Sequence, residues 1–178
     1  EQDPEAHWWS AIRETTHHLL ANSEIRASDV VAIVFCTQMM GTIPVDRDGQ
    51  PLMNCMTWMD TRAARQNKRV ISNPLKMLRM LRITGGLPSG KDIIGKILWV
   101  REEQPAIYEQ THKFLDCKDY LVHRATGHYV TSYDCANLTW FMDSRKGRFC
   151  WSQVILDWID LDADRLPRLA PSTDCLLY

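Results

Sequence analysis

The chain has 178 residues, of which 45% are hydrophobic and 24% are charged, the ordinary balance of one globular domain with a core of its own. The 21 basic and 22 acidic residues give a formal net charge of -1. This charge creates no overall field toward nucleic acid or an anionic membrane, so we expect neither as a partner.

Six cysteines are spread along the chain without a C-x-x-C pair and without histidines at zinc-ligand spacing. A secreted disulfide framework would be shorter and denser in cysteine. We therefore expect reduced thiols in a cytoplasmic protein, and no metal site. The longest apolar run, near residues 30–36, is far shorter than the ~20 residues that a membrane span needs. The acidic opening does not resemble a signal peptide.

The first predicted element is a helix from Pro4 to about Ala21. Asp3 is suited to its N-cap and Pro4 to its first position. Trp8, Ile12 and Leu19 fall near one face of this helix. Because the chain opens directly before a helix, with no strand ahead of it, we expect it to be a piece of a larger protein.

A β-branched apolar run follows at residues 30–35, and it lacks the alternation of a half-exposed strand. Such a run predicts a strand buried on both faces, in a parallel or mixed sheet with helices packed on it. A helix followed by a buried strand indicates an α/β arrangement. Residues 42–46 and 51–54 then predict a hairpin around the Asp-Gly turn at 47–50.

The remaining elements are shorter. An extended stretch at 55–58 precedes Asp60, which stands where the N-cap of an arginine-rich helix over 61–70 would be. The other predictions, in chain order, are helices over 75–81, 91–103 and 105–109, a strand over 113–115, a helix from Asp116 to Gly127, an irregular or helical element over 131–139, helices over 151–158 and 162–166, and a linker at 170–172.

Six short segments carry a further signal by their order. They are Asp3-Pro4-Glu5 with Trp8-Trp9; Phe35 to Gly41, against G-Q-M-H-G; Val45 to Leu52, against V-x-x-D-x-x-G-x-P-L; Trp58 to Ala63, against W-x-D-x-R; Lys96 to Glu103, against K-h-x-W-h-x-x-E, where h is apolar; and Lys118 to Gly127, against k-D-Y-l-x-x-r-l-T-G. Together they resemble the FGGY family of carbohydrate kinases, most nearly its xylulokinase-like branch.

The resemblance implies an α/β fold of the ribonuclease H-like, actin-like ATPase type, with a mixed sheet flanked by helices. Residues 1–178 would form part of the N-terminal, sugar-binding domain, and the ATP-binding C-terminal domain would lie outside them. The whole enzyme would transfer the γ-phosphoryl group of ATP, with Mg²⁺, to a sugar or polyol hydroxyl. The whole enzyme could also form a homo-oligomer.

Two family motifs have no counterpart in these residues. They are the phosphate-binding D-x-G-T-x-S hairpin and the G-x-x-D segment that carries the catalytic aspartate. We therefore expect no catalytic residue and no bound ATP or Mg²⁺ in this stretch alone, and no kinase activity of the isolated chain. The alternative is a non-catalytic sugar-binding or interaction domain derived from the kinase fold.

The resemblance assigns sugar binding to six residues: Gln38, Met39, Met40, Trp58, Asp60 and Arg62. Polyols are held by groups that donate and accept, or by charge-assisted hydrogen bonds, and by flat apolar faces. The loop after a buried strand is also where α/β sheets place ligands.

Each position has a plainer interpretation. Asp60 would cap a helix, Arg62 would be a solvated charge, Trp58 would belong to the core, and the methionines would be packing residues, which we favour for Met39. Lys96 and Trp99 are predicted to be structural. Lys113 and Tyr133-Asp134 are weaker candidates near the site, with a turn cap the alternative for the latter pair. Because xylulokinases usually carry His where Met40 stands, we expect a sugar preference other than D-xylulose.

Overall fold

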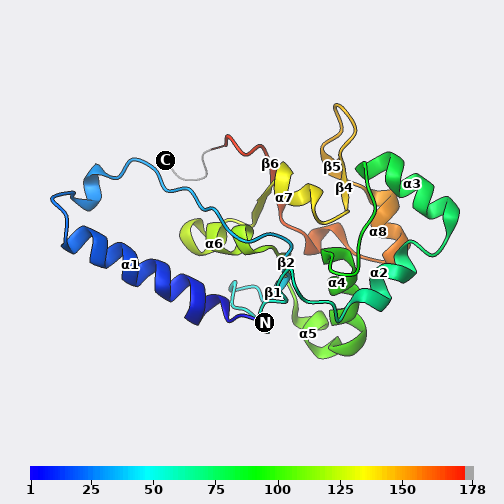
Figure 1. The fold of residues 1–178 in the computed structure, drawn as a ribbon, viewed down its shortest axis with the longest axis horizontal. Helices are drawn as coiled ribbons and strands as arrows, with labels where there is room; N and C mark the ends of the chain where they lie inside the picture. The colour runs from blue at the N-terminus through cyan, green and yellow to red at the C-terminus, as the bar shows by residue number, and fades with distance from the viewer. Residues whose placement is uncertain (175–178) are drawn as a thin grey trace.

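The computed structural model describes residues 1–174. A compact body contains most of the helices and all the strands, and an arm made of α1 and the segment that follows it extends from that body (Figure 1). The arm begins with a wider helical winding at Pro4–Trp9 and continues as α1, Ser10–Ala21. The Asp3 carboxylate caps it by accepting from the backbone N–H groups of Glu5 and Ala6, both at 2.9 Å. The predicted opening helix is therefore confirmed.

The apolar segment at 30–35 is not the buried strand that we predicted. It follows a short 3-10 turn, Ala27–Asp29, and runs back toward the body without regular pairing (Figure 1). Val31 is 98% exposed and Val34 is 90% exposed, and Phe35 alone packs against a hydrophobic cluster. Among residues 1–174 no strand pairs with this segment, so its side chains have no sheet to join.

The strands form three two-stranded sheets among the described residues, where we expected one mixed sheet. Strand β1, Ile43–Val45, pairs antiparallel with β2, Lys113–Leu115, with Ile43 opposite Leu115. Strand β3, Val130–Ser132, pairs parallel with β6, Arg168–Ala170, and β4, Met142–Asp143, pairs antiparallel with β5, Cys150–Trp151. The predicted strand over 113–115 is thus confirmed, whereas four short strands were missed.

The predicted hairpin is correct at its turn and incomplete in its second strand. The backbone N–H of Asp46 donates to the carbonyl of Gln50 at 3.0 Å, which closes the turn. Beyond it, a single bridge joins Val45 to Pro51 and the Leu52 N–H donates to the Pro44 carbonyl at 2.9 Å, while the regular pairing of β1 is with β2. The predicted linker at 170–172 is also wrong in part, since Ala170 ends β6.

The predicted helices over 75–81, 91–103, 105–109 and 116–127 are all present. The helices of the body are α2, Ala64–Val70; α3, Pro74–Thr84; α4, Ile93–Glu103; α5, Pro105–Gln110; α6, Cys117–Thr126; α7, Tyr133–Asn137; α8, Gln153–Ile159; and a 3-10 turn at Ala163–Arg165. Helix α8 begins two residues later than predicted, because Trp151 belongs to β5.

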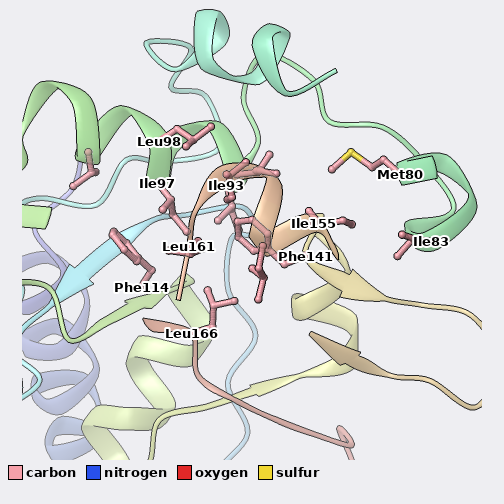
Figure 2. Packing of buried hydrophobic residues seen from close by; sticks show 14 of the residues in the cluster. Met80, Ile83, Ile93, Ile97, Leu98, Phe114, Phe141, Ile155, Leu161 and Leu166 are labelled. Carbon is pink, nitrogen blue, oxygen red and sulfur yellow. The ribbon is translucent and has the colours of Figure 1, made fainter. Parts of the chain in front are cut away.

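Helix α4 is the centre of the core. Its apolar side chains meet those of α8 and of the segments around Phe141 and Leu161 (Figure 2). A second, smaller cluster joins β1, β2 and α6, and Trp8, Trp9 and Ile12 of the arm pack against it. The candidate site lies where α4, α6 and the loop before β1 meet.

Candidate functional site

A buried aspartate fixes the loop at residues 38–41. Asp116 precedes α6, and its carboxylate accepts from the backbone N–H of Gly41 at 2.7 Å and of Met40 at 3.2 Å. Met40 itself has a positive φ of 62°, a conformation uncommon for a residue with a side chain. Gly41 packs so closely that a Cβ there would overlap Cys117. One side of the loop is therefore fixed by the residues that begin α6.

A buried lysine holds the same loop from the other side. Lys96 lies in the middle of α4 and is fully buried, and its ammonium donates to the carbonyls of Met40 at 2.6 Å and Thr57 at 2.8 Å. It thereby ties the loop at 38–41 to the segment that leads into Trp58. Burial lowers the pKa of Lys96, although Asp60 and Asp116 act in the opposite direction. The predicted structural role of Lys96 is confirmed.

Asp60 and Arg62 form a bidentate pair. The Arg62 Nε donates to Asp60 Oδ1 at 3.0 Å, and Nη2 lies 2.9 Å from Oδ2. Burial tends to raise the pKa of Asp60, but the hydrogen bonds and charge of Arg62 outweigh it, so that this pKa lies below its ordinary value. Asp60 does not cap a helix as predicted. The helix starts at Ala64, and the Asp60 carboxylate closes a turn onto the Arg62 N–H instead.

The two ends of the site meet the start of the chain. Gln38 donates its side-chain amide to Gln2 at 2.5 Å, and Gln2 also accepts from the indole N–H of Trp8. Arg62 contacts the Glu1 carboxylate at 2.6 Å. Its guanidinium also lies 5.0 Å from the centre of the Trp99 ring. Arg62 is exposed, as the solvated-charge interpretation expects, but it precedes the helix that starts at Ala64.

The apolar candidates differ in exposure. Trp58 is 44% exposed and Met39 is 53% exposed, so neither is a core residue, and the packing role that we favoured for Met39 is wrong. The Lys91 ammonium lies 5.7 Å from the Trp58 ring centre. Met40 and Trp99 do pack against the larger cluster, which confirms a packing role for both.

The two weaker candidates have structural partners. Lys113 donates to the carbonyls of Asp164 and Leu166, in the turn after α8. Asp134 binds the Lys118 ammonium at 3.0 Å and accepts from the Ser172 hydroxyl at 2.8 Å. No side chain caps α7, so the turn-cap interpretation of Asp134 is wrong.

Sequence reasoning missed that Lys96 and Asp116 build the loop. A lysine inside the apolar run Ile93 to Val100 was the available signal, because such a residue must find acceptors when it is buried. Asp116 showed only as a helix start. Its second role depends on contacts with residues 75 or more positions away.

The described residues contain neither a cluster of metal ligands, nor a disulfide bond, nor a membrane-spanning helix. Within residues 1–174, no three His, Cys, Asp or Glu side chains gather in a position to hold a metal ion. The five described cysteines are free thiols, and Cys175 lies outside the described residues. None of the helices in this range is long and apolar enough to cross a membrane.

The chain is similar in sequence to known carbohydrate kinases. Residues 1–176 match the N-terminal domain of the FGGY family of carbohydrate kinases. The xylulose kinase of Bacillus subtilis strain 168 is 33% identical over 180 residues, which is 99% of this chain and 34% of the relative. The glycerol kinase of Thermococcus kodakarensis is 25% identical over all of this chain and 36% of its own length.

A solved structure agrees with these relatives. The structure described as a "xyloylose kinase from Brucella ovis" is 29% identical and superposes with a TM-score of 0.85, over 96% of this chain and 34% of that one. The fold is thus that of the N-terminal lobe of these ribonuclease H-like sugar kinases, as predicted. The chain spans about a third of the length of the relatives it matches. It belongs to the FGGY family of carbohydrate kinases, whose N-terminal domain it matches along nearly its whole length.

Proposed function

We propose that this chain is the sugar-binding part of an ATP-dependent kinase that phosphorylates a hydroxyl of a xylulose-like sugar or polyol. One observation carries the proposal. Lys96 and Asp116 hold the loop at 38–41 against the segment that leads to Trp58, Asp60 and Arg62. Family membership supports the reaction class. We also propose a cytoplasmic location, which the free thiols favour.

The residues divide the work of binding a polyol. The exposed face of Trp58 would cover the C–H side of the sugar, as aromatic rings do for apolar surfaces. The Asp60 carboxylate would accept from hydroxyl groups, and its bond to Arg62 keeps it ionised and oriented. The Gln38 amide both donates and accepts. Positioning of this kind is the main contribution that proteins make to phosphoryl transfer.

ATP and Mg²⁺ would be held elsewhere in the protein. The chain spans about a third of the length of its relatives and matches the N-terminal domain of their family. We therefore propose that residues 1–178 are part of an N-terminal domain and that the nucleotide binds to a further domain. The described residues would bind and orient the sugar.

Kinetics of the full-length protein test this assignment. Asp60→Asn should raise the KM for the sugar about tenfold, the equivalent of ~1.4 kcal/mol of binding, with the KM for ATP unchanged. Asp48→Asn, in an exposed turn, is the matched control and should change neither value. Absence of ATP-dependent turnover across pentuloses, hexuloses and polyols would contradict the kinase proposal. Sugar binding without turnover would favour the non-catalytic alternative.

Met40 leads us to propose that D-xylulose is not the preferred sugar. A thioether cannot donate to a hydroxyl, whereas the His that xylulokinases usually carry here can. We expect Met40→His to raise kcat/KM for D-xylulose relative to the other sugars. His is also among the residues that tolerate a positive φ, so the loop should keep its shape. A strong preference of the unchanged protein for D-xylulose would overturn this proposal.

A further inference from the structure

A cavity lies on another part of the body and shares no residue with the candidate sugar site. It has a volume of about 620 Å³ and is bounded by α3 on one side and by the β4–β5 hairpin and the start of α8 on the other. This volume is within the usual range for small-molecule sites, about 300–1,000 Å³.

The cavity is strongly cationic. Its charged lining residues are four arginines and one aspartate, which leave a net charge of +3: Arg79, Arg82, Arg145, Arg148 and Asp143. Asp143 forms a bidentate pair with Arg145, which donates to its two carboxylate oxygens at 2.8 and 2.6 Å. Arg79, Arg82 and Arg148 have no carboxylate partner among residues 1–174. Three guanidinium groups are therefore left for an external anion.

The hairpin that carries two of these arginines is anchored at both ends. Phe149 stacks on Tyr133 of α7, with ring centres 5.2 Å apart. At the other end, the backbone N–H of Ser144 donates to the carbonyl of Ile83, in the last turn of α3, at 3.1 Å. This bond joins the two walls of the cavity. The arginines of the hairpin are therefore presented on a supported loop, which reduces the entropy lost when an anion binds.

Apolar surface completes the site. Leu75 and Leu78 of α3 line the cavity while 79% and 65% exposed, and Trp151 lines the opposite wall. An isolated inorganic anion would leave this surface uncovered. A molecule with an uncharged body and a phosphate group would use both the apolar wall and the arginines, since guanidinium groups bind phosphate through paired N–H donors.

We propose that this cavity binds a small phosphorylated molecule, such as a sugar phosphate. The site rests on the arginines and the cavity, and it stands whether or not the protein is a kinase. Arg82, in the last turn of α3, and Arg148, in the hairpin loop, approach the ligand from opposite walls. Both would contact its phosphate.

Calorimetric titration of the full-length protein tests the proposal. The probes are glucose 6-phosphate, inorganic pyrophosphate and uncharged glucose. The buffer contains EDTA to suppress metal-dependent nucleotide sites. We expect binding of glucose 6-phosphate and of pyrophosphate that weakens at least tenfold in Arg82→Gln/Arg148→Gln. Arg13→Gln, on the exposed face of α1, should retain the affinity of the unchanged protein. The single variant Arg148→Gln should weaken binding. Because Arg148 lies exposed in the hairpin loop, the melting temperature of this variant should stay that of the unchanged protein.

Three results would overturn the proposal. The first is that neither phosphorylated probe binds at millimolar concentration. The second is equal affinity in the unchanged protein, the double variant and Arg148→Gln, because the anions would then bind somewhere else. The third is equal weakening in Arg13→Gln, since that outcome indicates a diffuse charge effect.

Discussion

Lys96 is a charged side chain with no solvent contact, and its hydrogen-bond partners are carbonyl oxygens of two different segments. A buried ammonium is tolerated only when its donors are satisfied. Among the described residues the Met40 carbonyl has no other donor, whereas the Thr57 carbonyl also accepts from the Asp60 N–H at 3.0 Å. The residue therefore stabilises the relative position of the loop at 38–41 and the strand-like segment at 55–57.

Replacement of Lys96 tests that role. Lys96→Met keeps most of the side-chain volume but leaves the Met40 carbonyl without a donor among the described residues, and the Thr57 carbonyl with the Asp60 N–H alone. We expect the free energy of unfolding to fall by about 1–3 kcal/mol, the usual cost of buried unsatisfied groups. Urea unfolding measures this value, with the exposed Lys68→Met as control. Equal stability of the two variants would contradict the structural role.

Asp119 supplies a prediction of pH dependence. Burial, together with the charge of Asp116, raises the pKa of Asp119 to about 8, against about 3.9 in an unfolded chain. Between these values the folded protein binds a proton that the unfolded chain has lost. The free energy of unfolding is then highest at the acidic end and falls, by at most ~1.4 kcal/mol per pH unit, as the pH rises to about 8.

The variant Asp119→Asn isolates this effect. It removes the titrating group and should flatten the difference in unfolding free energy between pH 5 and pH 8, as measured by urea unfolding at several pH values. Asp48→Asn, in an exposed turn, should keep the slope of the unchanged protein. The slope of unfolding free energy against pH in Asp119→Asn is subtracted from the slope in the unchanged protein. A positive difference would refute the assignment.

At the scale of elements, α2 and α4 meet at a glycine. Asn67 of α2 accepts from the backbone N–H of Gly95 at 3.0 Å and donates to the carbonyl of Asp92 at 3.2 Å. A Cβ on Gly95 would overlap the Asn67 side chain. The absence of a side chain at this position lets the two helices approach and lets Asn67 cover the start of α4.

Gly95→Ala should therefore destabilise the protein although alanine favours helices by about 1 kcal/mol over glycine. We expect a lower melting temperature for Gly95→Ala and a smaller loss when the same change is made in an Asn67→Ala background. Thermal unfolding of the four proteins of this double-mutant cycle gives the coupling. Identical effects of Gly95→Ala in both backgrounds would show that the overlap is not the cause.

The same scale shows what the sequence could and could not predict. Helices α4 and α6 were predicted because apolar spacing and the caps at Asp116 and Gly127 are local signals. The run at 30–35 has the composition of a buried strand, yet burial needs a partner strand, and none of residues 1–174 provides one. Strands β4 and β5 are two residues each, too short to show a period.

The candidate site divides in the same way. Asp60 and Arg62 could be named as candidates because charged residues two positions apart are visible in a local motif, as are Gln38 and Trp58. The bonds from Lys96 to Met40 and Thr57 span 56 and 39 positions, and such pairs leave no mark in a single sequence. Sequence reasoning therefore named side chains of the site but missed the residues that bring the two segments together.

At the scale of the whole molecule, the arm presents an exposed apolar edge. Val31, Ile33 and Val34 are exposed along an extended backbone without strand partners among the described residues. Such an edge favours pairing with another chain.

We expect the 178-residue chain to self-associate at micromolar concentrations. Sedimentation velocity should show dissociation in Val31→Lys/Val34→Lys, while Thr15→Lys on α1 should behave like the unchanged chain. A monomeric unchanged chain would contradict this expectation.

The loop at 38–41 owes its shape to bonds that its own side chains do not make. Asp116 and Lys96 bind its backbone N–H and carbonyl groups, and the Gln38, Met39 and Met40 side chains take no part in those bonds. Substitutions at Gln38 and Met39 can therefore alter the chemistry presented to a ligand while the backbone stays in place, whereas a change at Met40 also alters its packing against the larger cluster. For evolution or design, this separation makes the loop a place where a new sugar preference can be acquired one side chain at a time, with α4 and α6 left unchanged.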